Sequence, residues 1–337
     1  MRISRRRILT AAGALPVLGS RIARAATPPK IRIAWVVAGA NLASILFAKS
    51  GIARHLGQSY EMQDVHFSST PEMITALATG DLDIGTLAYS SFALAIENAK
   101  MADLRAIADE FQDGVPGYYT DEYMVLKDSP IKTVTDLKGK VLATNGAGSA
   151  VDMSLRAMLR RHGLDDRKDV TIIEIGLPNM KAVLIEKKAD LICAVTPFSW
   201  DPQLRGMART LFTQKDAVGR TQMILWAARK GYLDTNRAAM ADFMEDALRA
   251  RRFYLDPANH DEAVAIVAKA TKLPPERFRG WIFTKKDYYR NPNGLPDLAA
   301  LQANVELQHR LGFLKTAFQV EEYTDLDLAK GAVQRLK

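Results

Sequence analysis

Hydroxyl, amide and aromatic side chains gather in short loops beside the expected strands and helices. Residues 68–70 (SST) and 145–149 (NGAGS) precede helices, whereas residues 89–91 (YSS) and 196–198 (TPF) follow strands. Backbone N–H groups at a helix start attract an anion without any need for lysine or arginine. Hydroxyls and rings suit a small polar or aromatic molecule. The chemistry that these residues favour is the reversible binding of a small solute.

Structural alternatives stay open for the same loops. Thr70, Ser90 and Ser149 are good helix caps, and capping alone explains each of them as well as ligand binding does. The glycine-rich loop is not a phosphate loop, because no Gly-Lys-Ser/Thr follows it. Asp83 and Asp190 end helix-to-strand turns, where we expect their carboxylates to bond local backbone N–H groups rather than to act in catalysis.

Signs of catalysis are few. The five histidines are scattered without metal-ligand spacing, and no Gly-x-Ser-x-Gly elbow occurs. Cys193 is the only cysteine, and its apolar neighbours predict a buried thiol on a strand. We therefore expect no catalytic residue, no metal site and no cofactor.

Two stretches 107 positions apart share one helix-to-strand pattern, residues 71–85 (PEMITALATGDLDIG) and 178–192 (PNMKAVLIEKKADLI). Proline, methionine, leucine and aspartate fall in step, and Pro71 and Pro178 each open a helix at its first turn. Two such units, each preceded by its own strand, suggest two similar α/β lobes with a cleft between them. Coincidence between ordinary β-α-β elements is the alternative.

Strands and helices alternate along the chain. We expect strands at residues 30–37, 65–68, 83–87, 104–110, 123–127, 141–144, 170–174, 191–195 and 222–228. We expect helices at residues 42–54, 71–78, 90–98, 151–162, 178–186, 237–254, 261–271 and 297–311. The segment 112–117 (QDGVPG) interrupts the alternation and marks a lobe boundary. The C-terminal helices pack most economically on the first lobe, so the chain crosses between lobes at least twice.

The first 25 residues have the features of an export signal. The run SRRRIL at residues 4–9 precedes an apolar segment, and Ala23-Arg24-Ala25 supplies a cleavage site. The paired arginines and the modest hydrophobicity favour a twin-arginine signal. This leader holds six arginines and no acidic residue, so its removal lowers the net charge from +8 to +2. The basic composition therefore gives no argument for nucleic-acid binding.

Residues 129–164 (SPIKTVTDLKGKVLATNGAGSAVDMSLRAMLRRHGL), together with ALATGDLDIG and the helical tail, resemble the periplasmic substrate-binding proteins of ABC importers, in the nitrate/sulfonate/taurine group. The most specific phrase is DSPIK followed by DLKGK. The resemblance implies an α/β, two-lobed periplasmic binding protein-like (type II) fold with a hinge and an inter-lobe ligand cleft. We expect a signal peptide at residues 1–25, lobe 1 at residues 26–117 plus 222–337, and lobe 2 at residues 118–221.

Site residues follow from this resemblance and from the loop positions. A ligand is expected to contact Asn41, Ser68, Ser69, Tyr89, Ser90, Ser149, Ala150, Asn179, Thr196 and Phe198. Tyr89 and Thr196 hold matched positions after strands and should face each other across the ligand, the alternative being that Tyr89 is a core residue. No definite anion-binding lysine or arginine is found, which leaves sulfonates, aliphatic or aromatic carboxylates, nitrate-like anions and nitrogenous solutes open.

The resemblance further implies a protein that is not an enzyme. It would capture a small anionic or aromatic, sulfonate-like solute in the periplasm by hinge closure and deliver it to the cognate ABC permease, and we expect a monomer. The rival interpretation is an enzyme on the same fold, related to thiamine-pyrimidine or menaquinone biosynthesis. An intracellular enzyme needs no twin-arginine leader, and one cysteine cannot supply the cysteine-rich motif of the pyrimidine-synthesising relatives.

Overall fold

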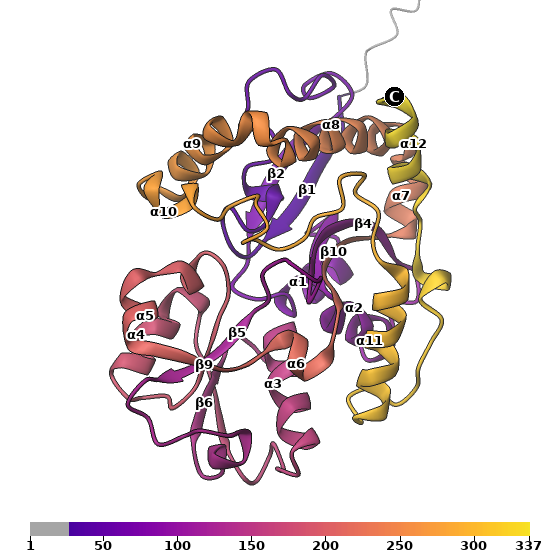
Figure 1. Cartoon of the computed structure of the whole chain (residues 1–337). Coiled ribbons are helices and arrows are strands. Elements are labelled where there is room, and N and C mark those ends of the chain that lie inside the picture. The colour runs from indigo at the N-terminus through magenta and orange to yellow at the C-terminus, as the bar shows by residue number, and fades with distance from the viewer. Residues whose placement is uncertain (1–26) are drawn as a thin grey trace, which may run out of the picture.

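The computed structural model describes residues 27–337, which form two α/β lobes (Figure 1). One sheet has the strand order β2-β1-β3-β10-β4; the other strands form a three-stranded sheet, β8-β5-β9, and a pair, β6-β7. We call the unit on the first sheet lobe 1 and the unit on the remaining strands lobe 2. The expected signal peptide lies outside the described residues. No helix within them is long and apolar enough to cross a membrane.

Ten strands and twelve α-helices make up the described chain. The strands are β1 Lys30–Trp35, β2 Glu61–His66, β3 Ile84–Ala88, β4 Leu104–Asp113, β5 Glu122–Leu126, β6 Val141–Thr144, β7 Thr171–Glu174, β8 Ile192–Ala194, β9 Ala208–Thr213 and β10 Thr221–Arg229. The helices are α1 Glu72–Thr79, α2 Tyr89–Glu97, α3 Ala150–Arg161, α4 Met180–Ile185, α5 Pro202–Met207, α6 Gln214–Val218, α7 Lys230–Thr235, α8 Arg237–Leu255, α9 His260–Thr271, α10 Glu276–Arg279, α11 Leu298–Arg310 and α12 Asp327–Arg335.

The two lobes repeat one strand order. In lobe 2 a parallel bridge between Leu142 and Leu191 joins β6 to the start of β8, which extends the order to β7-β6-β8-β5-β9. This order matches β2-β1-β3-β10-β4 strand for strand. The fourth strand, β5 or β10, runs antiparallel to both of its neighbours in each lobe.

The helix-to-strand repeat seen in the sequence forms α1–β3 in lobe 1 and α4–β8 in lobe 2. Asp83 accepts a hydrogen bond from the backbone N–H of Arg32 at 2.7 Å, and its own N–H donates to the Arg32 carbonyl. Asp190 makes the same two bonds with Val141, with the carboxylate at 2.9 Å. The expected local role of both aspartates is confirmed, because each ties the turn to the neighbouring strand.

Helices cover both faces of the lobe 1 sheet. One face packs on α8, α9 and α12 around Phe243, and the other packs on α1, α2 and α11 around Leu301. The C-terminal helices therefore lie on lobe 1, as expected, and the C-terminus ends beside α8 at the top of Figure 1. The chain passes between the lobes after β4 and again before β10.

The helix expected at residues 42–54 is wrong beyond its first turn. Only a 3₁₀ helix forms there, at Leu42–Ser44. Further on, the carboxylate of Asp246 in α8 accepts hydrogen bonds from the backbone N–H groups of Arg54 at 2.9 Å and His55 at 2.8 Å. A distant acid thus satisfies donors that an α-helix would have bonded internally.

Candidate ligand-binding site

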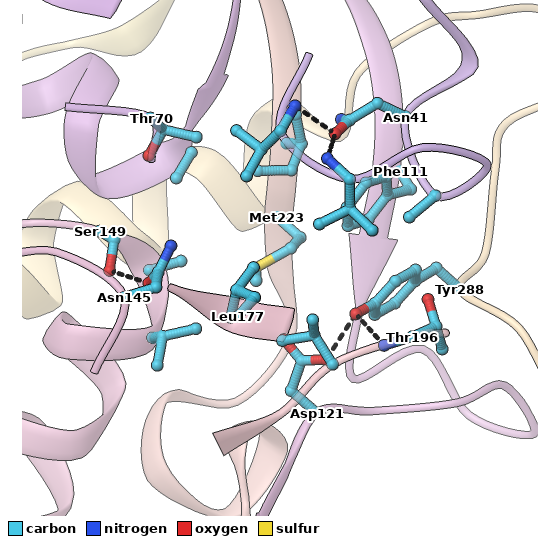
Figure 2. A pocket seen from close by; sticks show the side chains of 18 residues that line it. Asn41, Thr70, Phe111, Asp121, Asn145, Ser149, Leu177, Thr196, Met223 and Tyr288 are labelled. Atoms are coloured by element: carbon cyan, nitrogen blue, oxygen red, sulfur yellow. Dashed lines mark hydrogen bonds between the residues drawn. The ribbon is translucent and has the colours of Figure 1, made fainter. Parts of the chain in front are cut away.

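A cavity lies between the lobes, with an empty volume of about 500 Å³ when the solvent space at its mouth is included. Both lobes contribute walls, for example Thr70 from lobe 1 and Asn145 from lobe 2 (Figure 2). Most of the 18 lining side chains are apolar. The polar ones are Asn41, Thr70, Asp121, Asn145, Ser149, Thr196 and Tyr288.

Four of the residues expected from the sequence line this cavity: Asn41, Ser149, Ala150 and Thr196. The side-chain oxygen of Asn41 accepts hydrogen bonds from the N–H groups of Val36 and Val37, both at 3.0 Å. These bonds hold the loop after β1 and leave the amide nitrogen of Asn41 as the group that can donate to a ligand.

The start of α3 forms one end of the cavity. Ser149 caps this helix by accepting from the N–H of Asp152 at 3.2 Å, and its hydroxyl donates to the side-chain oxygen of Asn145 at 2.7 Å. Capping, the structural alternative for Ser149, is therefore confirmed. Ala150 and Val151 follow in the first turn and also line the cavity, so the positive end of the α3 dipole lies there.

Ser68 and Ser69 do not line the cavity; their neighbour Thr70 does. Glu72 explains the difference, because its carboxylate accepts from the backbone N–H of Ser68 at 3.2 Å and from the hydroxyl of Ser69 at 3.0 Å. Thr70 does not cap α1 with its side chain but shares a hydrogen bond of 2.7 Å with the hydroxyl of Ser91.

Tyr89 and Ser90 also lie away from the cavity lining. Tyr89 begins α2, is 1% exposed, and its hydroxyl lies 3.3 Å from the hydroxyl of Ser154 in α3. Burial raises the pKa of Tyr89. Ser90 donates to the carbonyl of Gly148 at 2.9 Å. Tyr89 follows β3 at the position matched to Thr196, but its side chain packs between α2 and α3. Tyr89 therefore does not face Thr196 across the cavity.

Asn179 and Phe198 are the remaining expected residues, and neither lines the cavity. Asn179 is exposed at the start of α4, and Leu177, two residues earlier, reaches the cavity instead. Phe198 lies in a 3₁₀ helix and lines a separate groove together with Cys193. Cys193 is buried, as its neighbours predict, and burial raises the pKa of its thiol.

Asp121 and Tyr288 are site residues that the sequence reasoning missed. Tyr288 lies in the loop between α10 and α11 and stacks on Phe111, with ring centroids 4.3 Å apart. Its hydroxyl donates to Asp121, which immediately precedes β5. Asp121 lies in the segment that crosses between the lobes and Tyr288 lies in a distant loop, so no periodicity in the sequence marks either residue. Only the lobe boundary expected at 112–117 points to the neighbourhood of Asp121.

The cavity lining differs in its charged groups from an anion site that is built on cationic side chains. No lysine or arginine is among the residues that line the cavity. Burial, and then the charge of Asp113, raises the pKa of Asp121 well above its usual value. Burial also raises the pKa of Asp113 to about 6. Within the described residues, no three His, Cys, Asp or Glu side chains are grouped so as to hold a metal ion.

Contacts between the lobes show that they are closed on each other. Asp201 of lobe 2 pairs with Arg277 of lobe 1 at 3.1 Å, and Trp200 stacks on Trp281 with centroids 6.2 Å apart. Elsewhere, Arg160 of α3 donates to the carbonyl of Leu311. The two lobes therefore meet around the cavity through contacts that an open arrangement of the lobes would break.

Known proteins resemble this chain along most of its length. The putative aliphatic sulfonates-binding protein of Escherichia coli (strain K12) is 27% identical over 282 residues, 79% of this chain and 79% of that protein. The alkanesulfonate-binding protein SsuA from Xanthomonas axonopodis pv. citri, solved bound to MOPS, matches 90% of this chain and 100% of its own at a TM-score of 0.69 and 21% identity. The periplasmic nitrate-binding protein NrtA from Synechocystis PCC 6803 matches 92% of this chain and 89% of its own, with a TM-score of 0.69 and 15% identity.

These matches confirm the two-lobed periplasmic binding protein fold and the resemblance found in the sequence. The sequence pattern of the NMT1-like family matches residues 24–268, well over half of the chain. The protein therefore belongs to the NMT1-like family.

Proposed function

We propose that this protein is the solute-binding component of an ABC importer and closes its lobes on a small anionic or aromatic, sulfonate-like solute. The observation that carries the proposal is the cavity between the lobes, whose walls come from both lobes and which no single lobe could form. Binding then favours the closed form, because a solute that touches both lobes stabilises their contact. The relatives named above for binding sulfonates and nitrate support the same role.

The start of α3 is the proposed position of the anionic group. The backbone N–H groups of Ala150 and Val151 make no hydrogen bond within the described residues, and both residues line the cavity. Together with the helix dipole, such groups favour an anion. The amide nitrogen of Asn145 supports this assignment, since the Asn145 oxygen is already used by Ser149. The apolar walls suit the rest of the solute.

The proposal includes a location and a partner. Export by the twin-arginine signal at residues 1–25, with cleavage near Ala25, would place the protein in the periplasm, where a permease in the inner membrane receives the solute. We assign residues 26–117 and 222–337 to lobe 1 and residues 118–221 to lobe 2, and we propose that the protein acts as a monomer.

The enzyme alternative finds no support at the site. Cys193 is buried, lies outside the cavity lining and has a raised pKa, so it is unsuited to act as a nucleophile on a bound solute. The curated relative is named as a binding protein and not as an enzyme.

Mass spectrometry of the small molecules released when the mature protein is denatured tests the function. The refolded, emptied protein is then screened by thermal shift with sulfonates, carboxylates and nitrate. We expect one solute class to raise the melting temperature in proportion to the logarithm of its concentration. At a hundredfold excess over Kd, the solute should increase the free energy of unfolding by about 2.7 kcal/mol. A protein that carries no solute and responds to none of these anions would contradict the proposal.

A further inference from the structure

Asp121, Thr196 and Tyr288 form the end of the cavity opposite Ser149 (Figure 2). The hydroxyl oxygen of Tyr288 accepts a hydrogen bond from the backbone N–H of Thr196 at 3.4 Å, and the same hydroxyl donates to Oδ1 of Asp121. A hydroxyl has a single hydrogen, so these two bonds fix its direction. Oδ1 of Asp121 is thereby satisfied, and Oδ2 is the oxygen that remains for the cavity.

Two buried oxygens at this end have no hydrogen-bond partner within the described residues, Oδ2 of Asp121 and Oγ1 of Thr196. Asp121 is 0% exposed and Thr196 is 1% exposed. Buried polar atoms are almost always hydrogen-bonded, and a buried carboxylate oxygen without a partner is especially costly. Both residues line the cavity, so a bound solute is the group that can supply the missing partner.

The charges around Asp121 indicate that this partner is positive. The titratable groups whose interaction with it is resolved are Asp113, Tyr119, Glu122, Tyr123, Cys193 and Tyr288. None of these side chains carries a positive charge. Lys215 acts on Asp113, and the cavity lining contains no lysine or arginine. Asp121 therefore lies among acidic and neutral groups, and burial, followed by the charge of Asp113, raises its pKa.

We propose that Asp121 determines the specificity of the cavity by accepting, together with Thr196, hydrogen bonds from a protonated amine of the solute. The inference rests on the proposed function, which places the anionic group of the solute at α3. The solute is then a zwitterion with an apolar body. Leu177 and Met223 lie between the Ser149 side and the Asp121 side in Figure 2 and provide the apolar walls for that body.

A protonated amine fits this end better than other groups. It has several N–H donors for the two unpaired oxygens, and its charge compensates the buried carboxylate. A hydroxyl or a water molecule would satisfy the hydrogen bonds but would not favour the charged form of the buried acid, as a cation does. A second anionic group would be repelled by Asp113 and Asp121 together.

Pairs of isosteric compounds that differ only by a methyl group in place of an ammonium group test the inference. Suitable probes are para-ethylbenzenesulfonate with para-aminomethylbenzenesulfonate, pentanesulfonate with aminobutanesulfonate, and the corresponding carboxylate pairs. Calorimetric titration of the emptied full-length mature protein should give at least about tenfold tighter binding to the ammonium member of a pair. Asp121→Asn keeps the shape of the side chain and should reduce this ratio to about one.

Two further variants make the result specific. Asp103→Asn removes a surface charge paired with Arg229 on lobe 1 and should leave the ratio unchanged. Thr196→Val removes the second acceptor and should lower the ratio partially, which gives a readout even where Asp121→Asn does not fold.

The outcomes separate the inference from the proposed function. Equal or tighter binding of the methyl members by the unaltered protein overturns the role of Asp121 and leaves solute capture intact. A tenfold preference that survives in Asp121→Asn also overturns it, because the amine is then recognised elsewhere. Failure of every probe to bind would contradict both this inference and the proposed solute class.

Discussion

The guanidinium of Arg277 in α10 lies 3.1 Å from the carboxylate of Asp201 at the start of α5, so this ion pair joins the two lobes. Lys181 in α4 lies 3.1 Å from the same carboxylate. Partial burial opposes ionisation, but the hydrogen bonds from the N–H of Leu204 and from both cations lower the pKa of Asp201 to about 2. The pair with Arg277 exists only when the lobes are together, so it stabilises the closed form.

Arg277→Ala should therefore weaken solute binding although Arg277 lies outside the cavity lining. Partly exposed ion pairs are worth about 0.2–1 kcal/mol, which corresponds to a loss of affinity of up to about fivefold by calorimetry. Arg279→Ala is the matched control, because Arg279 pairs with Asp261 within lobe 1. Equal affinities for the two variants would mean that the Asp201 pair does not contribute to closure.

Asn145→Asp tests the anionic group at α3. The substitution keeps the oxygen that accepts from Ser149 and adds a negative charge to the cavity wall. Repulsion at a few ångströms should weaken binding of an anionic solute at least about tenfold. Asn179→Asp is the control, since Asn179 is exposed and outside the lining. If both variants bind equally well, the anionic group lies elsewhere.

Substitution of Tyr89 should lower the stability of the protein, whereas substitution of Thr196 should weaken solute binding. Tyr89→Ala removes a side chain from the core and should lower the free energy of unfolding of the ligand-free protein by about 3–5 kcal/mol. Thr196→Val is nearly isosteric and removes an oxygen without a partner in the described chain, so it should weaken binding while barely changing the melting temperature. Melting curves beside titrations measure both. A stable Tyr89→Ala variant with lost affinity would return Tyr89 to the ligand site.

The sequence predicts the repeated architecture well, because it depends on local patterns. The stretches 71–85 and 178–192 formed equivalent helix-to-strand units, and Asp83 and Asp190 bond the neighbouring strand as expected. The helix at 42–54 was wrong because Asp246, almost two hundred residues away, supplies the competing acceptor.

The site was harder to predict, because side-chain direction depends on packing. Periodicity places Tyr89 and Thr196 after matched strands, but it does not predict that the side chain of Tyr89 points toward the contact between α2 and α3. Asp121 and Tyr288 belong to irregular segments that meet only in the folded chain. Spacing alone therefore finds Asn41, Ser149, Ala150 and Thr196 at the cavity and misses the buried carboxyl.

The stability of the ligand-free protein should fall as the pH rises. Burial holds the pKa of Asp113 at about 6, above the value of about 3.9 expected in the unfolded chain. Between these values the folded protein binds more protons than the unfolded one, so the free energy of unfolding decreases with pH. Raised pKa values of Asp109 and Glu110, also caused by burial, act in the same direction.

Denaturant titrations at a series of pH values measure this effect. We expect the free energy of unfolding to fall by about 1–3 kcal/mol between about pH 4 and pH 7. Below about pH 4 stability should decline again, because the lowered pKa of Asp201 and of Asp166 makes their protonation unfavourable to the folded state. A stability that rises steadily to pH 7 would show that Asp113 is not held protonated.

Small-angle X-ray scattering tests most directly whether the two lobes close on a solute. The emptied protein is measured alone and with a saturating amount of the solute identified by mass spectrometry. Because the cavity walls come from both lobes, the radius of gyration should decrease when the solute binds. An unchanged radius at saturation, with binding verified by calorimetry on the same sample, would contradict capture by closure.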